Sequence, residues 1–174
     1  MAVSLPSRFP RQRQKMSLVL PQSRRFSFNQ RPVPVPADLR INWRISLILA
    51  MLGTSRSNRA SLAKLHVLNY AARSTRVRTQ LTGIIVGTEP ALNWHMRIEP
   101  AFARAADFVV GERFAEWTRT AQRAGLQLTK TGIAAWKRLD DTEDVLADEK
   151  AFLKDTGRKV TEDFVSRLLQ ARRV

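Results

Sequence analysis

The sequence predicts a mainly helical protein with one small β-hairpin. Apolar residues recur at three- and four-residue spacing through most of residues 38–174, which is the pattern of helices with one buried face. Two short alternating stretches, 113–118 and 126–128, flank a basic polar tip and predict the hairpin. Hydrophobic residues make up 44% of the 174 residues, which is enough to form a core and excludes a wholly disordered chain.

The composition excludes several kinds of site. The chain has no Cys, which excludes disulfide scaffolds, thiolate metal sites and cysteine nucleophiles. His66 and His95 are the two histidines and have no second ligand at a useful spacing, so we expect no metal. No phosphate-binding loop or catalytic constellation is found, so we expect a protein that is not an enzyme and needs no cofactor.

The longest fully apolar run, 47–52, is much shorter than the roughly 18–20 residues that a membrane span needs. We therefore expect a soluble, cytoplasmic protein with no membrane contact.

The positive charge lies in the first half of the chain. Residues 1–80 contain 15 Lys and Arg and one acid, whereas residues 81–174 contain 15 Lys and Arg and 14 acids, which divides the net charge of +15 into +14 and +1. A region of this sign attracts nucleic acid, an acidic protein surface or anionic lipid. A solvated basic surface without a partner is the alternative.

Residues 1–37 are predicted to form an extended basic arm. They hold six of the eight prolines and no acid, which favours a polyproline-like chain. The bases expected to contact nucleic acid or an acidic partner are Arg8, Arg11, Arg13, Lys15, Arg24 and Arg25. A transit peptide and a true start at Met16 are the alternatives.

A helix is predicted from Asp38, as its N-cap, to about Leu52, where Gly53 ends it. Its apolar residues form two stripes and leave only a narrow polar seam. Such a helix must be buried on nearly all sides, either at the centre of the domain or partly against another chain. The residues of one stripe that are predicted to contact a protein partner are Trp43, Leu47 and Met51.

Four elements are predicted between this helix and the hairpin. A second helix spans about 60–73, and the basic cluster of Arg73, Arg76 and Arg78 follows its end. The β-branched run 84–86 fits a strand or a tight packed turn, and 94–98 is a second β-like piece. Pro100 suits the first turn of a helix that runs to about Val110.

The order helix, helix, short strand, helix, hairpin, helix is typical of a winged-helix domain, here residues 38–140. The stretch Leu126-Gln127-Leu128-Thr129-Lys130-Thr131-Gly132 resembles the second wing strand and the next helix of such proteins, with Thr129 or Thr131 as cap and Gly132 permitting close packing. The helix 100–110 would enter the major groove, but Arg104 is its one base-reading side chain. We therefore expect DNA contacts to be made to the backbone, by Arg73, Arg76 and Arg78 and by Arg119 and Arg123 of the wing.

Residues 141–174 are predicted to form a C-terminal helical extension. An acid-rich helix, including 140–149, runs to about Thr156 and Gly157 ends it; Thr161 then caps a last helix. The side chains of these helices that are predicted to contact a protein partner are Phe152, Phe164 and Leu168.

Two stretches resemble the middle-component proteins of bacterial ABC-three-component systems. The first runs from Arg40-Ile41-Asn42-Trp43-Arg44 through Ser61-Leu62-Ala63-Lys64-Leu65-His66-Val67-Leu68-Asn69-Tyr70, and the second joins Glu149-Lys150-x-Phe152-Leu153 to Lys159-Val160-Thr161-Glu162. The resemblance covers roughly residues 32–170, rests mostly on hydrophobic spacing, and leaves the arm outside it. Within that group the chain is most similar to the small accessory subunit of Lamassu-type anti-phage defence.

The resemblance implies a non-catalytic subunit that binds an SMC/Rad50-like ATPase near its head domains, beside an effector nuclease. Double-stranded DNA, held through its backbone, is a further candidate partner. The residues leave two other functions open: a winged-helix DNA-binding transcription regulator, and a general nucleic-acid-binding accessory protein.

Overall fold

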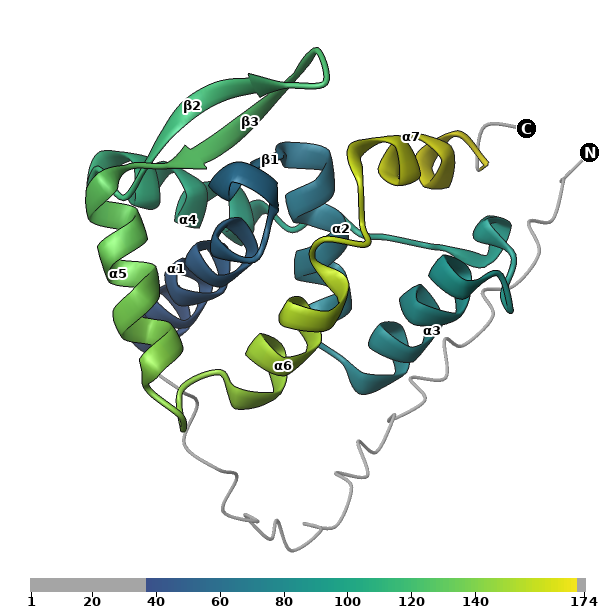
Figure 1. Ribbon diagram of the computed structural model, residues 1–174, viewed down its shortest axis with the longest axis horizontal. Helices are drawn as coiled ribbons and strands as arrows, with labels where there is room; N and C mark the ends of the chain where they lie inside the picture. Colours follow the sequence, from purple (N-terminus) through teal and green to yellow (C-terminus); the bar gives the residue numbers. More distant parts are fainter. Residues whose placement is uncertain (1–36, 172–174) are drawn as a thin grey trace, which may run out of the picture. The chain divides into compact units, whose positions relative to one another are not determined.

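A computed structural model describes residues 37–171, with side chains from residue 41, and the predicted arm lies outside these residues. The described residues belong to one compact unit, Val35–Val174. Its elements are α1 (Ala37–Gly53), β1 (Arg59–Ser61), α2 (Leu62–Ala72), α3 (Thr75–Val86), α4 (Pro100–Gly111), β2 (Ala115–Thr120), β3 (Arg123–Leu128), α5 (Lys130–Asp141), α6 (Ala147–Thr156) and α7 (Glu162–Gln170), with short 3₁₀ turns at Arg56–Asn58 and Ala91–Asn93 (Figure 1).

Helix α1 is the centre of this unit. Every residue from Leu47 to Leu52 is buried, and α1 contacts α2, α4, α5 and α6. The two apolar stripes predicted for this helix are thus covered by other elements of the same chain. Of the two ways to bury such a helix, the structure shows the central one.

The three strands form an antiparallel sheet in the order β1-β3-β2. Strands β2 and β3 make the predicted hairpin, but its tip is a two-residue turn, Ala121–Gln122, and not the seven residues 119–125. Strand β1 pairs with the other edge of β3, with Ala60 opposite Leu126. A strand after the first helix, α4 before the hairpin and this strand order together give the winged-helix topology, and the prediction of a mainly helical fold with a small β-hairpin is confirmed.

Three predicted elements were wrong. Residues 84–86 are not a strand but the last turn of α3, whose Leu81 and Ile84 are buried three residues apart on one face. Residues 94–98 form no strand and run in irregular chain after the 3₁₀ turn. The first strand of the sheet is instead β1. It includes the first residues of the helix predicted over 60–73, so α2 begins at Leu62.

Helix α1 begins at Ala37, so Asp38, the predicted N-cap, lies inside the helix. Three other helices begin with side-chain caps, of which Thr129 and Thr161 were predicted and Ser61 was not. Ser61, Thr129 and Thr161 accept hydrogen bonds from the backbone N–H groups three residues ahead, at 3.1 Å in each case. Thr129, and not Thr131, is therefore the cap of α5. The role predicted for Gly132 is confirmed, because a Cβ atom there would collide with the carbonyl oxygen of Phe114.

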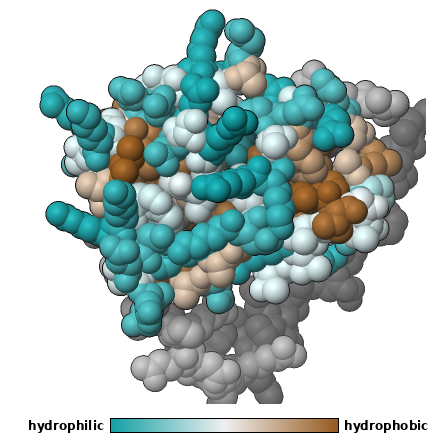
Figure 2. Space-filling model, in the orientation of Figure 1, coloured by the Kyte–Doolittle hydropathy of each residue, from teal (hydrophilic) through white to brown (hydrophobic). Residues whose placement is uncertain are grey.

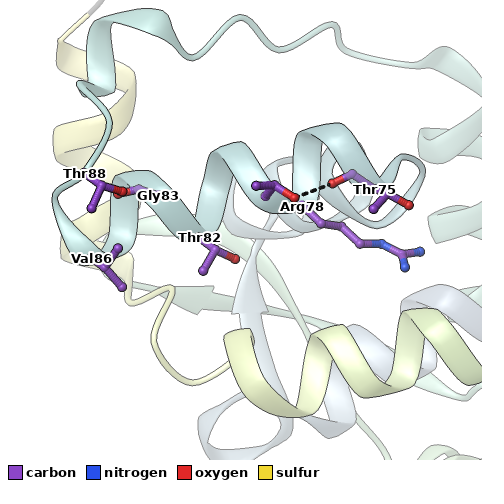
Figure 3. A pocket seen from close by; sticks show the side chains of 7 residues that line it. Thr75, Arg78, Thr82, Gly83, Val86 and Thr88 are labelled. Carbon is purple, nitrogen blue, oxygen red and sulfur yellow. Dashed lines mark hydrogen bonds between the residues drawn. The ribbon is translucent and has the colours of Figure 1, made fainter.

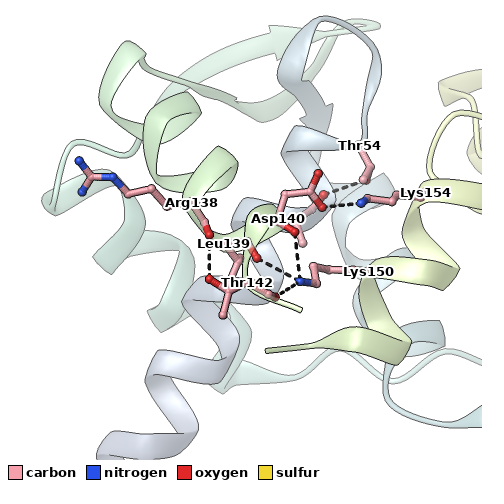
Figure 4. A network of polar contacts seen from close by, with 8 residues as sticks. Thr54, Arg138, Leu139, Asp140, Thr142, Lys150 and Lys154 are labelled. Atoms are coloured by element: carbon pink, nitrogen blue, oxygen red, sulfur yellow. Dashed lines mark hydrogen bonds and ion pairs between the residues drawn. The ribbon is translucent and has the colours of Figure 1, made fainter. Parts of the chain in front are cut away.

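The acid-rich segment is not one helix. Helix α5 ends at Asp141 and α6 begins at Ala147, so the acids of the cluster 140–149 are divided between the end of α5, the connection and the start of α6. Lys150 closes this connection: its buried Nζ donates to the carbonyl oxygens of Leu139 (3.1 Å), Asp140 (3.5 Å) and Thr142 at the end of α5 (Figure 4). A lysine therefore satisfies carbonyl groups that the helix end leaves without partners.

The C-terminal helices pack onto α2 through a set of four residues that we call the joint: Ser61, Lys64, Gly157 and Glu162. The buried Lys64 Nζ donates to the Gly157 carbonyl oxygen at 2.8 Å, and the Ser61 N–H donates to Glu162 Oε1 at 2.9 Å. The segment 141–171 is thus bonded to the winged-helix part by buried polar contacts.

Candidate functional site

Helix α4 occupies the position of the recognition helix in a winged helix. Phe102, Ala105, Ala106 and Val109 face the core, as the sequence predicts. Its exposed residues include Ala103, Arg104, Asp107 and Phe108. One base, one acid and one aromatic ring are a poor set for reading base edges, which calls for several Arg, Lys, Asn or Gln side chains.

The wing extends beyond the core beside α4 (Figure 1). Arg119 is exposed and Arg123 is half-buried, and neither side chain makes a hydrogen bond or an ion pair with any other residue in 37–171. Arg119 is therefore available to a ligand, whereas Arg123 has one terminal nitrogen, Nη1, buried without a hydrogen-bond partner among the described residues. Trp117 is also 51% exposed on β2, although it was not among the predicted site residues.

The three arginines of the predicted basic cluster after α2 differ in their contacts. Arg78 donates to the Ala72 carbonyl oxygen (2.5 Å) and to Glu149 Oε1 (3.0 Å), and its guanidinium lies 5.7 Å from the centre of the Phe152 ring. Arg78 thus joins α3 to α6 and is not a free phosphate contact. Arg76 is exposed and has no partner in the described part of the chain.

Arg73 belongs to a second charged group, at the start of α4. Glu99 accepts hydrogen bonds from Arg44 Nη2 (2.6 Å) and Arg73 Nη1 (3.1 Å). Burial alone would raise the pKa of Glu99, but the two arginines and Asn69 outweigh it, and the pKa is lowered from its ordinary value. The carboxylate therefore neutralises one predicted DNA contact, Arg73, and ties α1 and α2 to α4.

The predicted protein-interface residues fall into two groups. Leu47 and Met51 are completely buried and Leu168 is 2% exposed, so these three belong to the core of the chain itself. The assignment of Leu47 and Met51 to an interface is corrected on this ground, because these side chains pack inside their own domain, whereas Leu168 is almost fully buried but still lines a groove. The partly exposed members are Trp43, Phe152 and Phe164, and all three pack against the edge of the core.

Phe164 lines an apolar groove between the end of α3 and α7. The groove walls also include Ile84, Ile85, Ala91, Leu168 and Ala171, with one acid, Glu89, and one base, Arg167. A shallower depression follows the outer side of α3, where Thr75, Thr82 and Val86 face solvent (Figure 3). Its one charged residue, Arg78, is already paired, so that depression offers little to a ligand.

In a helix-turn-helix, a turn of about three or four residues joins the two helices. In this chain the corresponding helices, α2 and α4, are separated by the much longer segment 73–99. We call this segment the insertion. Six large apolar side chains are exposed among the described residues, and three lie in the insertion: Val86 (66%), Leu92 (61%) and Ile98 (70%). Val86 and Ile98 were missed because the sequence predicts a strand or tight packed turn over 84–86 and a β-like piece over 94–98, and Leu92 lies in a stretch to which no element was assigned.

The remaining apolar surface is scattered. The face drawn in Figure 2 is largely hydrophilic, with apolar side chains in separate small patches. Two other exposed apolar residues are Phe108 on α4 and Val145 before α6. The insertion is thus the segment that concentrates exposed apolar side chains.

Neither a group of metal-ligand side chains nor a membrane-spanning helix is found in residues 37–171. No three His, Asp or Glu side chains in that range are grouped as metal ligands would be. His66 packs against Phe102, with ring centroids 4.8 Å apart, and burial lowers its pKa. None of the helices in 37–171 combines the length and apolar character of a membrane span.

Comparisons with known proteins identify no relative: no family model, curated protein or solved structure matches the chain. Function must therefore be inferred from the surfaces above.

Proposed function

We propose that this chain is a non-catalytic winged-helix subunit that docks on an SMC-like ATPase and its effector nuclease in an anti-phage defence complex, as the sequence resemblance implies. The observation that carries a docking role is the insertion. It adds a helix to the winged-helix topology and exposes Val86, Leu92 and Ile98, each by more than 60%. Exposed apolar side chains gathered in one segment favour a protein partner over solvent.

The groove between α3 and α7 supports the same role. It lies where the insertion meets the last helix, and its walls are apolar apart from Glu89 and Arg167. An interface with an apolar centre and a few charges at its rim has this composition. Phe164, one of the predicted contact residues, faces this groove.

The residues that carry the resemblance have a different part in this proposal. Ser61 and Lys64 come from the first stretch and Glu162 from the second, and these residues bond α2 to the C-terminal segment. We infer that the shared pattern describes how the subunit folds, while the insertion gives it a partner.

The test begins with the gene neighbourhood, where we expect a large ATPase with coiled-coil heptads. Co-expression with that ATPase should give a complex that survives size-exclusion chromatography. Leu92→Glu and Val86→Glu should weaken the complex at least tenfold, which corresponds to about 1.4 kcal/mol.

Val145→Glu is the matched control, because Val145 is also exposed but lies outside the insertion. It should leave the complex intact. A monomer that never copurifies with such an ATPase, or equal effects of all three substitutions, would contradict the proposal.

A transcription regulator is the second candidate, and the winged-helix topology favours it. It would need α4 to read DNA, which Arg104 alone supports weakly. Protection of one palindromic site in the protein's own promoter would establish this function in place of the first.

A further inference from the structure

The wing carries an indole and a guanidinium on one face. In the register of the hairpin, Trp117 lies opposite Leu126 and Arg119 opposite Ala124. Alternate residues of a strand share a face, so Trp117 and Arg119 point to the same side. Leu126 is buried on that face, whereas Trp117 is 51% exposed, so the indole stands where the core ends and solvent begins.

A shallow depression surrounds the indole. Its lining consists of Trp117, Thr118, Arg119, Gln122 and Ala124. The small side chain of Ala124 leaves space beside the ring, and Arg119 and Gln122 supply hydrogen-bond donors at the rim. Within residues 37–171, neither Trp117 nor Arg119 has a hydrogen bond, ion pair or ring contact, so both remain available.

The turn that ends the wing is strained. Ala121 (φ 49°) and Gln122 (φ 62°) both adopt the left-handed region, which non-glycine residues seldom occupy. Two-residue hairpin turns of this kind match the twist of the strands and usually contain Asn and Gly. Strain of this kind gathers at binding sites, where the fold holds it in place. The turn here keeps the wing short and fixes Gln122 beside the depression.

The charge around the depression is positive. Arg119 is the one charged residue among those that line the depression. Glu116 is the nearest acid on β2, and strand alternation puts it on the opposite face. A ligand of this face should therefore be an anion with a flat apolar group.

We propose that the wing binds single-stranded nucleic acid, with an unpaired base stacked on Trp117 and a neighbouring phosphate held by Arg119. Successive bases of single strands stack on exposed aromatic rings, and basic side chains follow the backbone. Inside a duplex the faces of the bases are covered by their neighbours, so the indole can reach one only in a single strand or at an open end. The amide of Gln122 can meet a base edge or the sugar.

A protein partner fits this face less well. Protein hot spots are aromatic or arginine side chains set among well-packed neighbours that exclude water. Beyond Trp117, the exposed part of this face offers only Ala124, Arg119 and Gln122. One isolated ring among polar groups suits a planar base. This inference does not depend on the proposed ATPase partner.

The experiment uses the full chain and an oligothymidylate of about 15 nucleotides, a length that covers the usual site sizes. Salt of about 200 mM weakens purely electrostatic binding by the basic N-terminal residues. Anisotropy of the labelled oligonucleotide gives the affinity. Tryptophan emission reports stacking through the difference between wild type and Trp117→Phe, because Trp117 is exposed while Trp94 and Trp136 are buried and Trp43 is half-buried.

We expect the oligonucleotide to bind more tightly than a blunt duplex of equal length and to quench tryptophan emission. Trp117→Ala should lower the affinity about tenfold, within the range for loss of one base stack. Trp117→Phe should keep most of the affinity but lose most of the quenching. Arg119→Gln should lower the affinity and reduce the slope of log affinity against log salt by about one.

Phe108→Ala is the matched control, because Phe108 is 52% exposed on α4 and should leave affinity and quenching unchanged. Circular dichroism establishes that each variant is folded. No binding of the oligonucleotide, equal binding and quenching by wild type and Trp117→Ala, or tighter binding of the duplex would overturn the proposal. Loss of a protein complex in Trp117→Ala with oligonucleotide binding intact would also overturn it and assign the wing to a protein partner.

Discussion

In the joint, Lys64 is buried with its ammonium group 2.8 Å from a carbonyl oxygen, and Glu162 accepts the Ser61 N–H. In the wing, Arg119 extends into solvent and has no partner among residues 37–171. Both regions contribute basic residues to the same net charge, but the joint uses them to hold helices together and the wing leaves them for a ligand. A basic residue can be assigned to binding only after its internal contacts are known.

The largest expected effect is in the joint. Lys64→Met keeps the apolar stem but leaves the buried Gly157 carbonyl without its donor and Glu162 without its nearby cation. Burial lowers the pKa of Lys64, so the charge itself is costly there, but the lost donor outweighs this cost. We expect the free energy of unfolding, measured by urea titration, to fall by about 2–3 kcal/mol.

Lys154→Met is the control for that measurement. Lys154 forms an ion pair with Asp140 at 2.6 Å, but its side chain is 54% exposed. An exposed pair contributes about 0–1 kcal/mol, so this variant should lose less than Lys64→Met. Equal losses in the two variants would remove the distinction between buried and exposed lysines.

An intermediate effect is expected at Glu99, which pairs with two arginines at the start of α4. Since its pKa is lowered from 4.5 in the folded protein, its contribution to stability is present above that value and is lost as the pH falls through the folded pKa. Between about pH 6 and about pH 3, the free energy of unfolding of Glu99→Gln should therefore change less with pH than that of the wild type. We expect the difference between the two changes, measured by thermal unfolding, to be less than about 1 kcal/mol.

Glu89→Gln serves as the comparison, because Glu89 has no ion pair within the described residues. It should leave the pH dependence unchanged. A wild-type pH dependence that persists fully in Glu99→Gln would show that this carboxylate has no part in it.

The smallest effect on stability is expected in the wing. Arg119→Gln and Arg123→Gln should each change the free energy of unfolding by no more than about 0.5 kcal/mol, because neither guanidinium has an internal partner. Urea titration, as used for Lys64→Met, measures this change in the free energy of unfolding. If either variant lost as much stability as Lys64→Met, the wing would belong with the joint as a structural region.

Elements with local signals could be predicted from the sequence. Thr129 and Thr161 are N-cap residues and predict the starts of α5 and α7. Pro100 predicts the start of α4, because a helix tolerates proline in its first turn. The close approach at Gly132 also followed from its place after a capping threonine. Each of these features depends on residues within a few positions of one another.

Elements that depend on distant residues could not be predicted. Strand β1 is three residues, Arg59–Ser61, with little preference for a strand, and it forms because β3 presents an edge to it. The run Ile84-Ile85-Val86 favours a strand by composition, but Leu81 and Ile84 bury the same side of a helix. In both segments, contacts with distant residues determine whether the chain forms a strand or a helix.

The candidate site was predicted only in part, for the same reason. Arg78 looked like a free base because its partner, Glu149, lies 71 positions away. Leu47 and Met51 looked like interface residues because a sequence does not say whether the chain or a partner covers an apolar helix. Trp117 could have been found by pairing the two strands, since that pairing places it opposite Leu126 at the edge of the core.

The bond between Ser61 and Glu162 spans 101 positions, and its consequence concerns the order of biosynthesis. Domains generally fold as units while the ribosome is still adding residues. Helix α2 can form early, but the acceptor for the Ser61 N–H belongs to a residue that is translated 101 positions later. The nascent winged-helix part must therefore wait, with one side of α2 uncovered, until α7 has emerged from the ribosome.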